Sequence, residues 1–141
     1  MSRRVVIDTN VLVAALRSED GASRQVLRLC LQGKCEPLLG QKLFFEFLDV
    51  LGRPAMFAKS PATAEEREEL FYGFLAVCRW QDIFFLWRPN LTDEGDNHLV
   101  ELAVAGGAEF VVTHNTADFA QAELKFQTKV LTPAQFLKTL R

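Results

Sequence analysis

Apolar runs and helically spaced apolar positions alternate along nearly the whole chain. Short runs dominated by apolar or β-branched residues predict five strands, at residues 3–8, 35–39, 83–87, 108–113 and 128–131. Apolar positions at helical spacing predict helices at residues 11–16, 23–32, 41–51, 63–77, 96–105 and from 132 onward. Strands that alternate with helices predict an α/β fold with three layers, in which helices cover both faces of a parallel sheet.

Residues typical of helix ends mark several of these boundaries. Thr63 with Glu66 forms a capping-box pattern, and Thr132-Pro133 places a cap before a proline suited to the first turn. Thr9-Asn10 and Ser23 are candidate caps for the first two helices. The chain shows no repeat, low-complexity tract or linker, so we expect one domain spanning residues 1–141.

Composition places the chain among ordinary globular proteins. It has 141 residues, of which 49% are hydrophobic and 24% charged, with a net charge of −2. No strong basic field indicates nucleic-acid binding, although a site built from carboxylates would itself be acidic. The sequence has no secretion signal and no membrane-spanning run, and its three cysteines have no paired spacing. We therefore expect a cytoplasmic protein with free thiols and no membrane association.

Phenylalanine is unusually frequent, with 12 copies. Such a number exceeds the need of one small core, so part of the set is expected on the surface, covered by a partner. We predict a homodimer, with at least part of the set Phe44, Phe45, Phe57 and Phe71 at its interface or in the groove that receives another protein partner.

Several acidic residues fall where a parallel sheet binds its ligands. Asp8 ends the first predicted strand, Asp96 begins the helix after the third, and Asp118 follows the fourth. Ligands of parallel α/β sheets bind beyond the carboxyl ends of the strands, so we expect these carboxylates to share one rim.

Glu46 is the least expected acidic residue, because it lies on the apolar side of its helix. It comes three residues after Leu43 and four before Val50. Carboxylates gathered there with Asp8 and Asp96 would repel each other and raise each other's pKa. A divalent cation removes that conflict, and carboxylate oxygens suit Mg²⁺ or Mn²⁺. His98 and His114 lack the spacing of a zinc site.

Each acidic residue, taken alone, also has a simpler interpretation. Asp8 and Asp96 could be helix caps, Glu46 could extend to the surface, and Asp118 could be a turn residue. Their convergence on one rim favours the metal-site interpretation over four independent coincidences.

Four parts of the chain resemble a known family. The stretches 5–13, 93–99 and 110–119, together with Glu46 ahead of the Arg53-Pro54 turn, resemble the motifs of the PIN domain family. The resemblance is to the small bacterial and archaeal members that act as toxins in VapBC-type toxin–antitoxin pairs. It implies the strand order 3-2-1-4-5, cleavage of RNA with Mg²⁺ or Mn²⁺, a homodimer, and inhibition by an antitoxin.

The same resemblance assigns roles to individual residues. It implies that Asp8, Glu46 and Asp96 are metal ligands and catalytic residues. Many members have Asp where this chain has Asn115, so the fourth acidic role falls to Asp118, or a single metal suffices. Residues expected to orient the ligands are Thr9, Asn10, Thr113 and Asn115. Candidate contacts to substrate phosphates are Arg17, Arg24, Arg53 and Arg88.

We therefore expect a metal-dependent endoribonuclease, the toxin of a type II toxin–antitoxin pair. A housekeeping RNA-processing nuclease and a non-catalytic PIN-like module that binds RNA or protein are the alternatives. A phosphatase of a doubly wound fold would want a second Asp two residues after Asp8, where this chain has Asn10.

Overall fold

The computed structural model of the chain describes residues 3–83, 97–119 and 128–140, without the side chains of Asn97 and Asp118. Its strands are β1 (Arg3–Ile7), β2 (Cys35–Leu39), β3 (Arg79–Trp80), β4 (Phe110–Val112) and β5 (Lys129–Leu131). Its α-helices are α1 (Thr9–Arg17), α2 (Ala22–Leu31), α3 (Gln41–Leu51), α4 (Ala64–Val77), α5 (Asn97–Gly106) and α7 (Pro133–Thr139). Two short 3₁₀ helices are η1 (Pro54–Phe57) and η3 (Thr116–Phe119).

The five strands form one sheet in the order β3-β2-β1-β4-β5, and every neighbouring pair is parallel. β1 is the central strand, paired with β2 on one side and with β4 on the other. Both the fold class and the strand order predicted from the sequence are confirmed.

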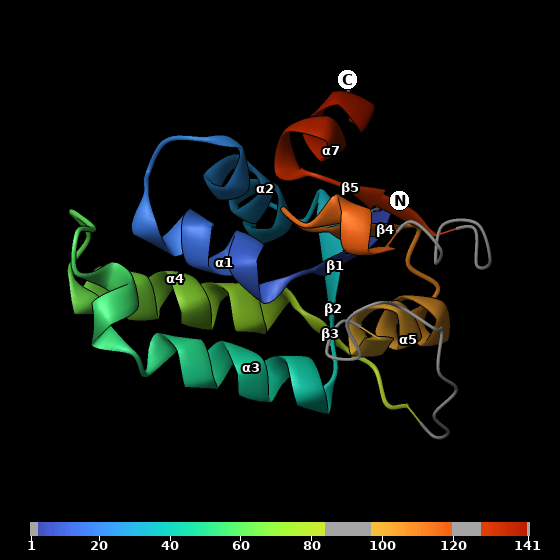
Figure 1. Cartoon of the computed structure of the whole chain (residues 1–141), viewed down its shortest axis with the longest axis horizontal. Coiled ribbons are helices and arrows are strands. Elements are labelled where there is room, and N and C mark those ends of the chain that lie inside the picture. Colours follow the sequence, from blue (N-terminus) through green and yellow to red (C-terminus); the bar gives the residue numbers. More distant parts are fainter. Residues whose placement is uncertain (1–2, 84–96, 120–127, 141) are drawn as a thin grey trace.

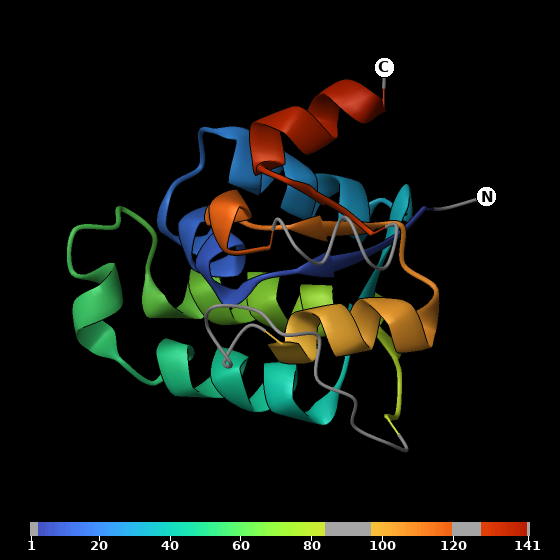
Figure 2. The same cartoon turned by 45° about the vertical axis from the view of Figure 1, so that its right-hand side comes forward.

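Helices cover both faces of this sheet, which explains why the carboxyl-terminal halves of its inner strands are apolar and buried. Figures 1 and 2 show α2 and α7 on one side and α5 on the other. α5 contacts β1, β2 and β4, whereas α2 contacts β2, α1, α4 and α7. Val5 and Val6 of β1 point to opposite faces, yet both are fully buried.

α3 and α4 pack together through aromatic side chains beside the sheet. Phe47 of α3 meets Phe71 and Phe74 of α4 edge to face, with ring centroids 6.3 and 6.0 Å apart. No helix in the described part of the chain has the length and apolar character needed to cross a bilayer.

The third strand differs from its predicted position. The apolar run 83–87 predicts it, but β3 is Arg79–Trp80, and residues 84–87 lie outside the described part of the chain. Both residues of β3 are exposed, because the strand is short and lies at the edge of the sheet. An exposed edge strand carries no apolar run, so the hydrophobic pattern did not reveal it.

The predicted caps are confirmed at two helices and wrong at two others. Thr132 forms a full capping box with Gln135, and the Thr63 hydroxyl accepts the Glu66 backbone N–H. At α1, however, the cap position is Asp8, whose side chain makes no capping hydrogen bond. At α2 the cap position is Gly21, with a φ of 108° that favours glycine.

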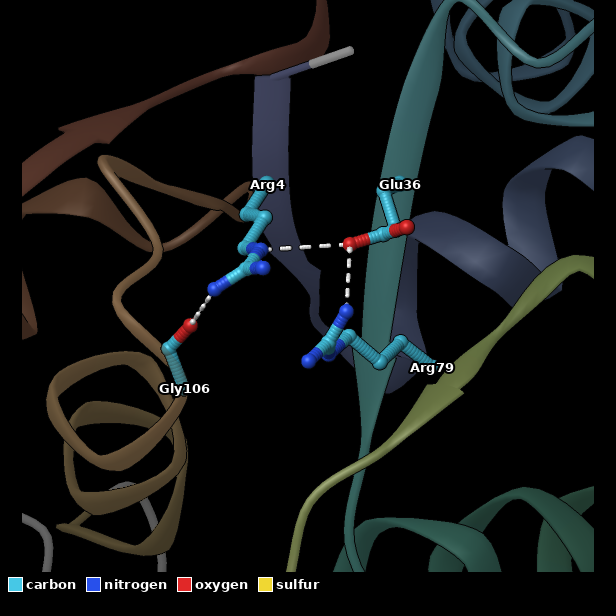
Figure 3. A network of polar contacts seen from close by, with 4 residues as sticks. All are labelled: Arg4, Glu36, Arg79 and Gly106. Carbon is cyan, nitrogen blue, oxygen red and sulfur yellow. Dashed lines mark hydrogen bonds and ion pairs between the residues drawn. The ribbon is translucent and has the colours of Figure 1, made fainter. Parts of the chain in front are cut away.

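A polar network joins three neighbouring strands to the end of α5 (Figure 3). Arg4 Nε of β1 donates to Glu36 Oε1 of β2 at 3.2 Å, and Arg79 Nη1 of β3 lies 3.8 Å from the same oxygen. Arg4 Nη1 also donates to the Gly106 carbonyl at 3.0 Å. The side chains are partly exposed, so the ion pairs contribute little stability, but they tie β1 to the last turn of α5.

The phenylalanine set predicted to cover a dimer interface divides in two. Phe57 and Phe71 are 4% and 3% exposed, so both belong to the core, and the part of the set left for an interface is Phe44 and Phe45. Phe44 is partly buried against the core, whereas Phe45 is 57% exposed. The core contains more phenylalanine than the sequence suggested, because η1 and α4 both bury phenylalanine rings in the helical layer beside α3.

The contact between α5 and β2 leaves no space for a side chain at Gly106. A Cβ built there would lie 2.3 Å from a methyl carbon of Leu38, which is 1% exposed and cannot easily move. We predict that Gly106→Ala lowers the free energy of unfolding by about 1–3 kcal/mol through overpacking. Urea denaturation measures this change.

Gly73, in the middle of α4, is the matched control, since a Cβ there meets Leu31 at 3.4 Å, an ordinary contact. Gly73→Ala should leave stability unchanged or raise it by up to about 1 kcal/mol, because alanine favours the helix. Equal effects of the two substitutions would contradict the close packing of α5 on β2.

Candidate active site

Asp8 and Thr113 lie side by side beyond the carboxyl ends of β1 and β4. The pairing of the two strands continues past β1, because the Asp8 backbone N–H donates to the Val112 carbonyl at 3.0 Å. Thr113 directly follows β4, and its hydroxyl donates to Asp8 Oδ2 at 2.7 Å. The carboxylate is therefore bonded across the sheet to the neighbouring strand, although it makes no capping hydrogen bond within α1.

The Thr113 hydroxyl is fully buried and uses all of its hydrogen-bonding capacity. It donates to Asp8 and accepts from the Asn10 side-chain amide at 3.4 Å and from the Asn115 backbone N–H at 3.1 Å. Asn10 Oδ1 in turn accepts the His114 backbone N–H at 3.3 Å. The start of α1 and the segment after β4 are thus joined around one carboxylate.

Glu46 reaches the same region from α3. The Thr9 hydroxyl donates to Glu46 Oε2 at 3.2 Å, and His98 Nε2 lies 3.0 Å from Glu46 Oε1. Its neighbours Leu43 and Phe47 are buried, whereas the Glu46 side chain is 39% exposed. The sequence pattern is compatible with either a core or a surface position for Glu46. The structure places it at the edge of the apolar face of α3, between the two.

The environment of Asp8 disfavours its charged form. Burial raises the pKa of the Asp8 carboxyl above its ordinary value of 3.8, and the negative charge of Glu46 adds to that effect. The hydrogen bond from Thr113, the backbone N–H of Thr9 and the charge of His98 oppose the shift but do not cancel it. An ionised Asp8 therefore lacks full compensation from the residues around it.

Glu46 behaves in the opposite way. Burial alone would raise the pKa of its carboxyl, but the hydrogen bond and charge of His98, then Thr9 and Lys42, hold it below the ordinary value of 4.5. The prediction that the two carboxylates raise each other's pKa is confirmed for Asp8 and wrong for Glu46. The reason is that Glu46 is less buried and has two side-chain donors.

Both carboxylates line one open cleft of about 640 Å³. Its walls come from α1, α3, η1 and the segment after β4, and the polar and charged residues among them are Asp8, Thr9, Asn10, Arg17, Glu46, Asp49, Arg53 and His114. Arg17 and Arg53, two of the candidate phosphate contacts, therefore line the same cleft as the two carboxylates. Arg53 also pairs with Asp49 one helical turn earlier, in an ion pair exposed on both sides.

Other predicted residues lie elsewhere or outside the description. Arg24 is buried and donates through Nε to the Ala15 carbonyl, so it faces the interior and not the cleft. Asn115 is exposed and contributes only its backbone N–H to the network. Asp96 and Arg88 lie outside the described residues, and of Asp118 the structure describes only its backbone, within η3.

The described segments hold two of the predicted metal ligands, Asp8 and Glu46. Within residues 3–83, 97–119 and 128–140, no three His, Cys, Asp or Glu side chains come together as a metal site. The described part of the chain therefore supplies two carboxylates to one cleft. The other two predicted ligands are Asp96, which lies outside the described residues, and Asp118, whose side chain is not described.

His98 is the site residue whose role the sequence did not reveal. It is buried on α5, and it lines a second cavity of about 630 Å³ together with Glu101, Lys42 and Asp82, among others. Its contact with Glu46 depends on how α5 packs against α3, 52 residues away in sequence. The local signal is its place two residues after Asp96, in a helix of mainly apolar residues.

The sequence matches a known protein family over most of its length. The sequence model of the PIN domain family matches residues 4–117, which include Asp8, Glu46 and Thr113. The chain belongs to the PIN domain family. A search of curated proteins by sequence finds no match.

A solved structure shares the fold of this PIN domain. It is VapBC2 from Rickettsia felis bound to a DNA fragment from their promoter, with a TM-score of 0.55 and 15% sequence identity. The similarity covers 91% of this chain and 96% of that chain. At this level of identity the likeness is one of fold.

The opposite pKa shifts in this PIN domain predict opposite effects of two neutral substitutions on stability in EDTA. Because the pKa of Asp8 is raised, its ionisation destabilises the folded state, so Asp8→Asn should raise the melting temperature at pH 7. The gain should shrink as the pH falls through the raised pKa, and vanish below 3.8, where the unfolded state is protonated as well.

Glu46→Gln is the matched comparison. Because the pKa of Glu46 is lowered, its ionised form stabilises the fold above pH 4.5, and that stability is lost as the pH falls through the lowered pKa. Glu46→Gln should therefore lower the melting temperature at pH 7, by an amount that shrinks in acid. Melting curves for both variants between pH 3 and 7 test this, and shifts of the same sign would contradict the assignment.

Proposed function

We propose that this PIN domain is a metal-dependent endoribonuclease and the toxin of a type II toxin–antitoxin pair. The observation that carries the proposal is the cleft in which Asp8 and Glu46 meet two arginines. Membership in the PIN family and the resemblance of the motifs to VapBC-type toxins support it further.

The donor set fits a hard divalent cation. Asp8 and Glu46 supply carboxylate oxygens to one cleft, and oxygen ligands suit Mg²⁺ or Mn²⁺. Burial raises the pKa of Asp8, which makes its negative charge unfavourable, and a bound cation would offset that charge. We propose Asp8, Glu46 and Asp96 as ligands, with Asp118 in the fourth acidic role.

The chain's own residues would orient the reactants. Thr113 fixes Asp8 Oδ2 from the neighbouring strand, and Thr9 fixes Glu46 Oε2 from α1. Arg17 and Arg53 line the same cleft, and their guanidinium groups can bind phosphate oxygens of the RNA backbone. When bound, Mg²⁺ or Mn²⁺ lowers the pKa of water and offsets the charge that develops on the phosphate during hydrolysis.

The proposal includes two protein partners, an antitoxin and a second copy of this chain. The exposed apolar residues of α3 and α4, Phe45, Leu48 and Tyr72, replace the buried Phe57 and Phe71 as the surface for the homodimer. Light scattering of the purified protein tests the second copy, and a monomer at high concentration would contradict it.

Cleavage of RNA in the presence of Mn²⁺ tests the catalytic part of the proposal. Asp8→Asn and Asp96→Asn each remove a charged ligand while keeping the side-chain shape, so cleavage of single-stranded RNA should fall by several orders of magnitude. Asn115→Asp should maintain or increase cleavage, because it adds a carboxylate beside the same site. Glu109→Gln, an exposed change at the opposite end of β4, should leave cleavage unchanged.

Three results would count against the proposal. Equal cleavage by the wild type and Asp8→Asn would point to a contaminating nuclease. Tight binding of varied RNAs without cleavage would favour a non-catalytic module. Expression in a bacterial host that leaves growth unaffected, despite cleavage in vitro, would favour a housekeeping nuclease over a toxin.

A further inference from the structure

The Glu46 carboxylate is held from two sides by two different helices. Thr9 of α1 donates to Oε2 at 3.2 Å, and His98 of α5 lies 3.0 Å from Oε1. Glu46 itself belongs to α3. Three helices that are separate in sequence therefore determine where a single carboxylate points.

The chemistry of the groups defines the direction of the His98 contact. An ionised carboxylate only accepts hydrogen bonds, so at a separation of 3.0 Å His98 Nε2 is the donor and Glu46 Oε1 the acceptor. The His98 side chain is 7% exposed, whereas that of Glu46 is 39% exposed. The ring is thus fixed by its surroundings, and the longer, more exposed glutamate adjusts to it.

The two residues face different spaces. Glu46 lines the cleft with Asp8, whereas His98 lines the second cavity on α5 and is not among the residues that line the cleft. The hydrogen bond to Glu46 is therefore the described contact through which His98 can act on a ligand in the cleft, besides the effect of its charge on Asp8. Ring nitrogens and hydroxyls that hold a metal-binding carboxylate in place commonly determine metal affinity as strongly as some ligands do.

We propose that His98 is a positioning residue, which holds Glu46 in the orientation that binds the divalent cation. The inference rests on the proposed function of the cleft. Without the Nε2 hydrogen bond, Glu46 keeps its contact with Thr9 but is held from one side instead of two, so the cleft has a less preorganised ligand. His98 touches neither the substrate nor the cation in this account.

Two polar substitutions that differ in reach test this role. The amide of His98→Gln can occupy the place of Nε2 and donate to Glu46, whereas the shorter amide of His98→Asn cannot. Calorimetric titration with Mn²⁺ should show roughly 10–100-fold weaker binding for His98→Asn, and binding within about threefold of the wild type for His98→Gln. A structural role alone would impair both variants alike.

A double-mutant cycle identifies the partner through which His98 acts. In a Glu46→Gln background, the further change His98→Asn should cause no additional loss of Mn²⁺ affinity, because the carboxylate that it positions is already gone. Losses that add in full would overturn the inference. So would equal binding by the two His98 variants, or tighter binding by His98→Asn, which would mean that His98 competes with the cation for Glu46.

Separate controls distinguish this inference from the proposed function. Wild-type protein that binds no Mn²⁺ at millimolar concentration would overturn both. Mn²⁺ binding that is lost in Asp8→Asn but unchanged in His98→Asn would leave the proposed function intact and overturn the role of His98.

If His98→Asn does not fold, as judged by circular dichroism in EDTA, the wild-type ring decides the question. Titration with Mg²⁺ should shift the ¹⁵N resonances of the His98 ring in the wild type, and not in Glu46→Gln. Ring signals that stay in place while Mg²⁺ binds would overturn the inference.

Discussion

The hydrogen bond from Thr113 to Asp8 is the contact on which the site depends. A carboxylate buried at the end of a central strand is unfavourable, and here one oxygen accepts a hydrogen bond from the residue that follows the neighbouring strand. Since β1 and β4 are adjacent and parallel, their carboxyl ends deliver Asp8 and Thr113 to the same place. The strand order alone is therefore enough to bring these two side chains together, without any contribution from a helix.

The helices then complete the site, but in doing so they make the ionised form of Asp8 less favourable. α1 begins at Thr9, which binds Glu46 of α3, while the burial of Asp8 and the charge of Glu46 raise the pKa of Asp8. Thr113, Thr9 and His98 reduce that cost without removing it. A site that keeps part of its negative charge uncompensated is suited to bind a cation. The two arginines that line the same cleft are suited to bind an anionic substrate.

The sequence predicts most of this fold because its signals are local. The apolar runs around Val5 and Phe110, the cap at Thr132 and the proline after it depend on neighbouring residues alone. The strand order came from the resemblance to PIN domains, since periodicity does not determine which strands are adjacent. The position of Asp8 at the rim follows from the strand that precedes it.

The remaining features depend on contacts between distant elements. β3 is an exposed edge strand, so Arg79 and Trp80 carry no apolar signal. Phe57 and Phe71 resemble surface rings in the sequence, but the packing of α4 and η1 buries them. The sequence gives no sign that Arg24 is buried, because its hydrogen bond to the Ala15 carbonyl depends on how α2 packs against α1. The pairing of His98 with Glu46 requires α5 to meet α3, and no residue near either one in sequence indicates it.

The central claim is that Asp8 and Glu46 form one divalent-cation site in this cleft. Crystals grown with Mn²⁺ and measured near the manganese absorption edge test it most directly, because anomalous scattering locates the ion without reference to activity. The account predicts an anomalous peak in the cleft against the Asp8 carboxylate, present in the wild type and absent in Asp8→Asn. A well-ordered cleft without such a peak at millimolar Mn²⁺, or a peak bound elsewhere that persists in Asp8→Asn, would contradict it.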